Sequence, residues 1–246
     1  MLCCRPTRRS TLHACEQAMV APNCSTLVTP PLDYTPVRSP QAVHSVLARH
    51  FRHRDVIELG TRFGDGMMCF AQVASNATAV ERDVSLCEIL RERSAGLRNR
   101  TGHSFTTICS RFQEVERLDA DYFTWWMGSS ELNGIILEDL RMRYAAGRIR
   151  KHATALVLFE AVDQDWPRLR NLSRWSEDVD FDERSLTRKL ARKKPWMVGR
   201  ANGTLTIGAF RLSDIPTNVR SLVVANAPPR SSHQIEKIER AVGRRR

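Results

Sequence analysis

Residues 55–66, DVIELGTRFGDG, place an acidic side chain directly before a glycine-rich turn, a combination that can hold a polar ligand against the backbone. Asp55–Leu59 is a short, mostly apolar run, as expected of a buried parallel strand. Gly60 permits a tight turn after this strand, and Gly64 lets a following helix approach a ligand with no side chain between them. Glu58 therefore lies where the carboxyl end of a strand opens into the binding crevice of an α/β sheet.

A second acidic residue follows at a spacing that suits a nucleoside. Thr78 to Val80 is strand-like and ends on Glu81, which lies 21 residues beyond Gly60. In nucleotide-binding α/β folds, an acidic residue about 20 residues after the turn hydrogen-bonds a ribose. One helix leading away and one strand returning bring that carboxylate beside the turn. The alternative for Glu81 is a solvated strand end.

The two segments resemble the motifs of a known enzyme family. ELGTRFGDG resembles the first motif of the class I S-adenosylmethionine (SAM)-dependent methyltransferases, in the variant E-hydrophobic-G-T-x-x-G-x-small. AVERDVSLCEIL is similar to their second motif, an acid-ended strand before an amphipathic helix. The glycines do not follow the dinucleotide pattern G-x-G-x-x-G. The resemblance extends from about Pro36 to Leu212, and it implies a three-layer Rossmann-like α/β fold.

The rest of the chain alternates between helical and strand-like patterns. Helices are expected at Gln41–Arg52, Met67–Ser75, Val84–Leu97 and Glu131–His152. Further strands are expected at Ser104–Cys109, Tyr122–Met127 and Thr154–Phe159. This alternation predicts a parallel sheet with right-handed crossovers.

The end of the domain is expected to be antiparallel. Trp196–Arg200 and Thr204–Leu212 are strand-like and are separated by Ala201, Asn202 and Gly203. Asn-Gly between two such runs indicates a β-hairpin. A seven-stranded, mostly parallel sheet that ends in a C-terminal antiparallel hairpin is typical of the methyltransferase fold, so this pattern supports the resemblance.

The resemblance implies a cofactor role for ten residues. Glu58 and the glycine turn would hold the methionine part of S-adenosyl-L-methionine, and Glu81 would accept hydrogen bonds from the ribose hydroxyls. Arg82 would flank the adenine, and the residues after the third strand would contact its edge, although the Asp common there is missing. Trp125 ends the fourth strand at the mouth of the site, with a core position as its alternative. The ten are Glu58, Gly60, Thr61, Gly64, Gly66, Glu81, Arg82, Ser110, Arg111 and Trp125.

No residue is identified as catalytic. Methyl transfer is an in-line displacement that depends mainly on positioning. Residues 125–127, WWM, stand where metal-dependent O-methyltransferases have an Asp, and Glu160, Asp163 and Asp165 alone make a poor magnesium site, so no metal is expected. The N/D-P-P-Y/F motif of amino-methyltransferases is absent. Glu160, Asp163 or His152 could serve as a general base, and the sequence does not rank them.

Composition indicates one domain with basic ends. The chain has 246 residues, of which 42% are hydrophobic, and a net charge of +11. We expect a flexible basic arm over residues 1–35, a methyltransferase-like domain over 36–215 and a basic tail over 216–246. The basic flanks could attract RNA or another polyanion, or could be solvated helix faces. No run of about 18 apolar residues exists, so no membrane span is expected.

The cysteines and the N-terminal segment bear on location. The spacing of the seven cysteines predicts that Cys69, Cys87 and Cys109 are buried, reduced thiols. Five N-x-S/T sequons occur, and without a secretory apolar segment we expect them to be coincidental. The expected location is intracellular and cytoplasmic, with a mitochondrion or plastid as the alternative because the N-terminus is rich in arginine.

Two functions remain open at this point. The first is an active SAM-dependent methyltransferase with an unidentified methyl acceptor. The alternative is a catalytically inactive methyltransferase-like binding or assembly factor associated with RNA. The intact set of Glu58, Gly60, Gly64 and Glu81 favours the first, whereas the missing acids after the third and fourth strands favour the second. The oligomeric state is not predicted.

Overall fold

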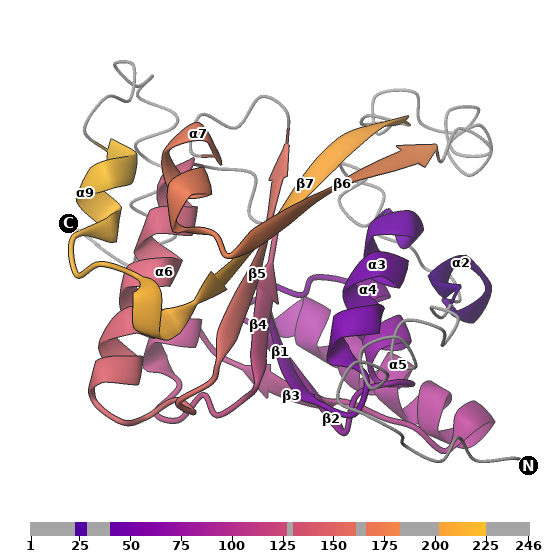
Figure 1. Cartoon of the computed structure of the whole chain (residues 1–246). Helices are drawn as coiled ribbons and strands as arrows, with labels where there is room; N and C mark the ends of the chain where they lie inside the picture. The colour runs from indigo at the N-terminus through magenta and orange to yellow at the C-terminus, as the bar shows by residue number, and fades with distance from the viewer. Residues whose placement is uncertain (1–22, 29–39, 127–129, 161–165, 183–201, 225–246) are drawn as a thin grey trace, which may run out of the picture.

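The computed structural model describes residues 23–28, 40–126, 130–160, 166–182 and 202–224. A seven-stranded sheet of order β3-β2-β1-β4-β5-β7-β6 forms the middle of three layers, with helices on both faces (Figure 1). The strands are β1 Asp55–Leu59, β2 Asn76–Glu81, β3 Thr106–Cys109, β4 Tyr122–Trp125, β5 Thr154–Glu160, β6 Trp175–Asp182 and β7 Asn202–Arg211. The helices are α2 Cys24–Leu27, α3 Gln41–Phe51, α4 Asp65–Phe70, α5 Val84–Thr101, α6 Ser130–Ala145, α7 Trp166–Leu169 and α9 Val219–Val224. The predicted fold class is confirmed.

The strand order creates a crevice at the carboxyl edge of the sheet. β1, β2 and β3 run outward in one direction, and the chain then returns to place β4 on the other side of β1. The last residue of β1, Leu59, pairs with Val80 of β2 and with Trp125 of β4, so these strands end at one level. This is the topological switch point of the sheet, where ligands bind in open α/β folds.

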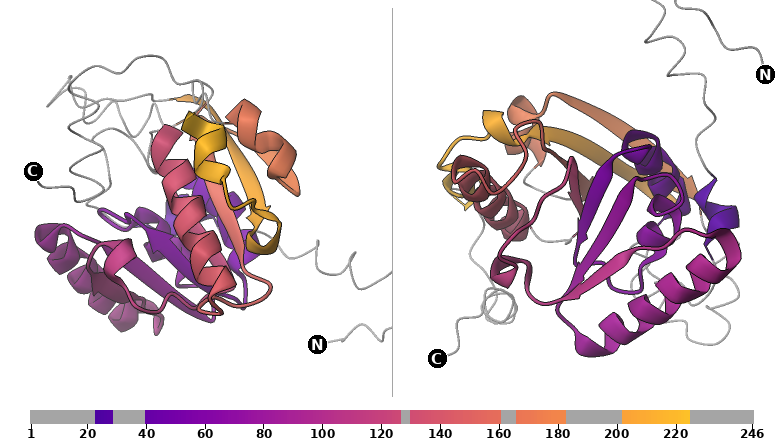
Figure 2. Two further views of the ribbon diagram at one scale, coloured as in Figure 1. Left: turned by 90° about the vertical axis from the view of Figure 1, so that its left-hand side faces the viewer. Right: turned by 90° about the horizontal axis from the view of Figure 1, so that it is seen from below.

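Each face of the sheet is covered by its own apolar core. Phe51 of α3, Met67 and Phe70 of α4 and Leu90 of α5 are fully buried in one core. On the other face, α6 packs through residues such as Leu140, which is also fully buried. Figure 2 shows the two helical layers on opposite sides of the twisted sheet. Burial on both faces explains why the central strands are nearly continuous apolar runs.

The antiparallel end of the sheet is confirmed, but its turn was predicted at the wrong place. Asn202 and Gly203 do not form a turn; they lie inside β7 and pair with Asp182 and Phe181 of β6. The partner strand is therefore Trp175–Asp182, and residues 196–200 lie outside the described residues. Buried Val179 and Phe181 alternate in β6 with exposed acids, as expected of a strand at the edge of a sheet.

Three predicted helices differ in length from the observed ones. α4 ends at Phe70 rather than Ser75, and α5 continues to Thr101, where Gly102 in the left-handed conformation caps it. α6 ends at Ala145 rather than His152, and Gly147 then turns the chain with a φ of 69°. Among the described residues, no helix is long and apolar enough to cross a membrane.

The prediction of reduced cysteines is wrong. Cys24 is bonded to Cys69, and Cys87 is bonded to Cys109. The first disulfide ties α2, which lies in the segment expected to be a flexible arm, to α4. The second ties the first turn of α5 to the end of β3. The sequence spacing gave no sign of these pairs because each brings together segments that only the fold makes neighbours.

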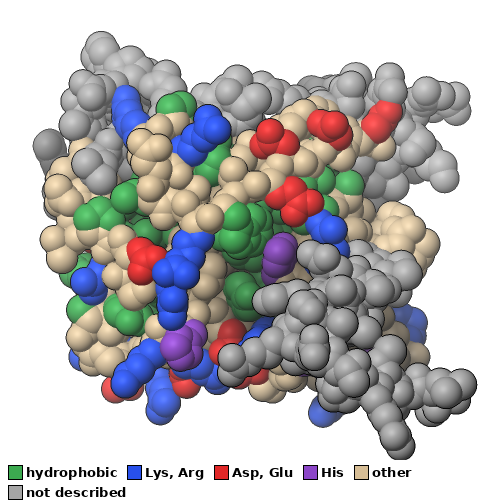
Figure 3. Space-filling model, in the orientation of Figure 1, with side chains coloured by type: hydrophobic (Ala, Val, Ile, Leu, Met, Phe, Trp, Pro, Cys, Tyr) green, Lys and Arg blue, Asp and Glu red, His purple; other side chains and the backbone are tan. Residues whose placement is uncertain are grey.

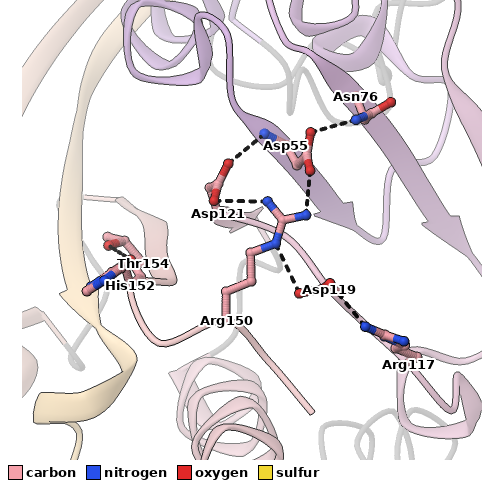
Figure 4. Close-up of polar contacts among 8 residues, drawn as sticks. All are labelled: Asp55, Asn76, Arg117, Asp119, Asp121, Arg150, His152 and Thr154. Carbon is pink, nitrogen blue, oxygen red and sulfur yellow. Dashed lines mark hydrogen bonds and ion pairs between the residues drawn. The ribbon is translucent and has the colours of Figure 1, made fainter. Parts of the chain in front are cut away.

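An arginine holds the amino ends of β1 and β4 together. Arg150 donates to Asp55 at 2.6 Å and to Asp119 and Asp121 at 3.1 Å each, and Asn76 of β2 donates to Asp55 at 2.7 Å (Figure 4). Burial would raise the pKa of Asp55, but the hydrogen bonds from Asn76 and Arg150 and the charge of Arg150 outweigh it and lower that pKa.

The Arg150 cluster makes stability depend on pH. A carboxyl with a lowered pKa in the folded state stabilises the protein above its ordinary value of 3.8 and loses that effect as pH falls through the folded value. We expect Arg150→Met to lower the free energy of unfolding by about 1–2 kcal/mol at pH 7, a value reduced for partial exposure of the pair. Below pH 4 the difference from wild type should shrink.

Urea unfolding at pH 7 and at pH 3 measures this effect. Arg148→Met is the matched control, because Arg148 is an exposed arginine two residues away. A loss in Arg150→Met that is equally large at both pH values would contradict the assignment to charged partners.

Candidate functional site

The glycine turn after β1 has the left-handed backbone that its sequence requires. Gly60 and Gly64 adopt φ values of 71° and 80°, and Arg62 between them adopts 55°. The Gly60 amide donates to the carbonyl of Val80 at 2.8 Å, which fastens the turn to β2. Thr61 Oγ1 donates to the carbonyl of Glu58 at 3.0 Å. The turn is therefore held from both sides at the carboxyl edge of the sheet.

Glycine is also required where α4 begins. A Cβ on Gly64 would lie 2.5 Å from a side-chain carbon of Leu90. A Cβ on Gly66 would lie 2.8 Å from Glu58 Oε1 and 2.8 Å from the ring of Phe70. Gly66 thus leaves the space in which the Glu58 carboxylate lies, and only a residue without a side chain fits there.

Glu81 lies beside this turn, as its spacing predicted. Its side chain is buried, and its Oε2 accepts a hydrogen bond from the Arg62 amide at 2.9 Å. Its Oε1 accepts from the amides of Arg82 at 2.8 Å and Asp83 at 3.0 Å. A carboxylate has about four acceptor positions, so Glu81 is fixed by the backbone and keeps capacity for a ligand hydroxyl.

A buried ion pair between Arg93 and Asp65 holds the glycine turn against α5. Arg93 of α5 donates to Asp65 Oδ1 at 2.8 Å and to the carbonyl of Phe63 at 2.6 Å. The side chains of Arg93 and Asp65 are 6% and 2% exposed. Arg93 therefore links α5 to both the turn and the first residue of α4. The sequence analysis did not identify this pair, because its members are 28 residues apart.

A pocket opens between the turn and the ends of β4 and β5. It is lined by His44, Leu47, Glu58, Leu59, Gly60, Thr61, Arg62, Thr124, Trp125, Trp126 and Leu158. Four of the ten predicted site residues line it, namely Glu58, Gly60, Thr61 and Trp125. Three polar atoms of other lining residues make no hydrogen bond within the described part of the chain: His44 Nδ1, Thr124 Oγ1 and Trp126 Nε1.

His44 is the histidine among the lining residues, and sequence patterns did not assign it to the site. It lies on the buried side of α3, 5% exposed, with its ring edge-to-face against Phe70 at 5.5 Å between centroids. Burial lowers its pKa from 6.5 to about 3, so the imidazole is neutral at physiological pH. The only sequence signal was a histidine among the apolar positions of an amphipathic helix.

Trp125 lines the pocket, whereas Arg82, Ser110 and Arg111 lie beside Glu81. Trp125 is 1% exposed, and its Nε1 donates to Asn133 Oδ1 at 2.9 Å, so it belongs to the core as well as to the pocket wall. Ser110 follows β3, and its amide donates to the carbonyl of Glu81 at 2.9 Å. The Ser110 hydroxyl and the Arg111 guanidinium both contact Glu114. Ser110, Arg111 and Arg82 are therefore on the Glu81 side and do not line the pocket.

Of the candidate general bases, His152 lies away from the pocket. His152 precedes β5 on the side of the Arg150 cluster (Figure 4). It contacts Arg211 at 3.0 Å, at the edge of the sheet opposite to the pocket. This position rules out His152 as a base acting in the pocket. Glu160 is the last residue of β5, and Asp163 and Asp165 lie outside the described residues.

Comparison with known proteins identifies the fold. No protein-family model matches the chain, and no curated protein matches its sequence. Among solved structures, it is similar to a Pyrococcus horikoshii protein proposed to be an RNA methyltransferase, with a TM-score of 0.51 and 13% identity over 78% of this chain and 94% of that one. It is also similar to precorrin-6y C5,15-methyltransferase from Geobacter metallireducens, with a TM-score of 0.51 and 11% identity over 77% and 96%.

A third similar structure is the tRNA (m1A58) methyltransferase TrmI from Aquifex aeolicus, with a TM-score of 0.51 and 10% identity over 75% of this chain and 73% of that one. All three share the overall fold described above. The chain thus has the fold of class I SAM-dependent methyltransferases.

Proposed function

We propose that the protein is a SAM-dependent methyltransferase whose cofactor lies across the carboxyl ends of β1, β2 and β4. The observation that carries the proposal is the position of Glu81. Its buried carboxylate lies against the glycine turn and is held there by the Arg62 amide. That arrangement leaves an acceptor position that suits a ribose hydroxyl. Gly66 leaves room for the Glu58 carboxylate beside the turn, and a carboxylate there suits the ammonium at the amino-acid end of the same ligand.

Each end of the cofactor would meet side chains of matching chemistry. Glu58 in the pocket would attract the ammonium of the methionine part. Arg82, Ser110 and Arg111 lie beyond Glu81 and would flank the adenine. SAM supplies an electrophilic methyl group on a sulfonium, and the chain's contribution is to bind, orient and exclude water, because in-line displacement depends on alignment.

The acceptor would enter the same pocket from the side of α3. His44, Thr124 and Trp126 offer polar atoms there that have no hydrogen-bond partner among the described residues. None of the three is charged at neutral pH, since burial keeps the His44 imidazole neutral. They would bind the polar groups of the acceptor by hydrogen bonds, and leaving them unpaired would cost free energy in the unliganded protein.

RNA is one acceptor class that the comparisons support, because two of the similar structures are described as RNA and tRNA methyltransferases. The surface gives this class less support. Arg143 is bonded to Asp139 and to three carbonyls, and Arg150 is bonded to three carboxylates, so both are engaged within the fold. Acidic side chains gather over β6 and would repel a polyanion (Figure 3).

A change at Gly66 tests the cofactor assignment through shape. Gly66→Ala would push the Glu58 carboxylate or the Phe70 ring away, and overpacking of this kind costs about 1–3 kcal/mol. We therefore expect SAM affinity to fall about tenfold or more in a calorimetric titration. Gly96→Ala is the control, because its Cβ would meet only the side chain of Arg100 and Ala favours a helix. Equal SAM affinity in the two variants would contradict the assignment.

Activity is tested by turnover. The protein is incubated with SAM and with separate acceptor pools of total RNA, denatured protein and small metabolites, and S-adenosylhomocysteine is measured. Release that depends on one pool identifies the acceptor class. SAM binding without release in any pool would favour the alternative, a binding or assembly factor that has lost methyl transfer.

A further inference from the structure

The asparagines of this chain fall in N-x-S/T sequons far more often than its composition predicts. Five of its eight asparagines begin such a tripeptide: Asn23, Asn76, Asn99, Asn171 and Asn202. Since 34 of the 246 residues are Ser or Thr, chance would supply roughly one sequon among eight asparagines. This excess argues against the expectation, drawn from the sequence, that the five tripeptides are coincidental.

The fold leaves sequon side chains accessible. Asn99, in the last turn of α5, and Asn171, just before β6, are both exposed, and neither side chain makes a described hydrogen bond. Asn23 is exposed and caps α2 through its Oδ1. Asn76 is also exposed, but its Nδ2 donates to Asp55 in the Arg150 cluster, so a glycan there would disturb that contact. Asn99 and Asn171 are thus the sites best suited to carry a modification.

The disulfides point to the same compartment. Cys24–Cys69 and Cys87–Cys109 pair four of the seven cysteines. Disulfides persist in secreted and lumenal proteins and are rare in the cytosol, where thiols are kept reduced. N-linked glycosylation marks surface positions of proteins that pass through the same oxidising compartment. Two independent chemical features therefore agree.

We propose that this chain matures in an oxidising secretory compartment, where it receives N-linked glycans at Asn99 and Asn171 and forms the Cys24–Cys69 and Cys87–Cys109 disulfides. This inference replaces the cytoplasmic location expected from the sequence, and it does not rest on SAM binding.

Both covalent steps use reactants that such a compartment supplies. In glycan transfer from a lipid-linked pyrophosphate donor, the bond from the anomeric carbon to the pyrophosphate oxygen breaks, and a bond from that carbon to asparagine Nδ2 forms. The amide loses one proton, and the lipid pyrophosphate leaves. In each disulfide, two thiols give two electrons and two protons to an acceptor disulfide, which becomes a dithiol.

The two glycans would leave the candidate site open. α5 starts at the carboxyl edge of the sheet beside Glu81 and runs back, so Asn99 in its last turn lies toward the opposite edge. β6 is antiparallel to β7, which is antiparallel to β5, so β6 begins at the amino edge of the parallel strands, with Asn171 just before it. A bulky sugar at either position would therefore lie away from the pocket lined by Glu58 and His44.

The test uses the protein isolated from the cells that naturally produce it. Digestion with peptide-N-glycosidase F in H₂¹⁸O converts a glycosylated asparagine to ¹⁸O-labelled aspartate, which mass spectrometry locates. We expect the label at Asn99 and Asn171. Asn218 is the internal control, because it is exposed but begins no sequon. Unlabelled Asn99 and Asn171 would overturn the glycosylation.

Two further measurements test the glycan at Asn99 and the two disulfides separately. In cells that express the full chain, Thr101→Ala should remove one glycan mass while keeping Asn99, and Asn218→Gln should change nothing. Alkylation of denatured protein without reductant should leave Cys24, Cys69, Cys87 and Cys109 unmodified, and alkylation of denatured protein after reduction should label all four. Labelling before reduction would overturn the proposed oxidising compartment.

Discussion

Glu81→Ala is expected to weaken SAM binding by about 1.5–3 kcal/mol, or roughly 10- to 150-fold in Kd, which is the scale of hydrogen bonds lost to a charged group. The carboxylate is buried beside the glycine turn, so water cannot replace it well as a partner for the ribose. Removing it also frees the amides of Arg62, Arg82 and Asp83, which loosens the turn. Both effects act in the same direction on affinity.

Calorimetric titration of folded protein measures this loss. Glu88→Ala is the matched control, because Glu88 is an exposed acid in the following helix α5. Thermal unfolding of each variant separates lost binding from lost folding. If folded Glu81→Ala binds SAM as tightly as wild type and as Glu88→Ala, the ribose assignment is wrong.

Arg93→Met is expected to lower the free energy of unfolding by about 3–5 kcal/mol, the typical effect of breaking a buried ion pair. Arg93 and Asp65 are almost completely buried, so the substitution leaves a carboxylate in the core beneath the glycine turn. It also removes the donor to the Phe63 carbonyl. Urea unfolding at pH 7 gives the loss, and Arg91→Met, at an exposed position of the same helix, should change stability little.

A double variant isolates the charge effect. Arg93→Met combined with Asp65→Leu removes both charges and should recover much of the stability lost in Arg93→Met, because a buried apolar pair avoids the desolvation penalty. SAM affinity should be lower than in wild type in both the single and the double variant, since the turn has lost its link to α5 in each. If the double variant is no more stable than Arg93→Met, the loss of stability comes from packing rather than from the buried Asp65 carboxylate.

The part of the fold that the sequence predicts is the part whose pattern is local. β1, β2 and β5 are apolar runs of strand length, and the Glu81 spacing reflects a single β-α-β unit, so both follow from neighbouring residues. The predicted position of the hairpin turn is wrong, because an Asn-Gly pair indicates a turn only where the chain reverses direction. In this chain residues 202 and 203 begin β7 and pair with the last two residues of β6, which ends 20 residues earlier. The alternation of apolar and acidic residues in β6 is the sequence pattern that would have predicted the correct partner strand of β7.

The candidate site likewise contains residues that local sequence patterns predicted and residues that they did not. Motif and spacing predicted that Glu58, Gly60, Gly64 and Glu81 lie beside one another on consecutive elements, and their cofactor role stays a prediction. His44 and the Arg93–Asp65 pair were missed because they come from helices that meet the turn only in three dimensions. The disulfides were missed for the same reason, since an odd number of cysteines without C-x-x-C pairs contains no information on which segments become neighbours.

Calorimetric titration of the purified protein with SAM and, separately, with NAD tests the proposed SAM site most directly. We expect micromolar SAM binding with one site per chain and no binding of NAD, because the turn lacks the dinucleotide glycine pattern. A well-folded protein that does not bind SAM would contradict the central claim. Binding of NAD in place of SAM would assign the turn and Glu81 to a dinucleotide.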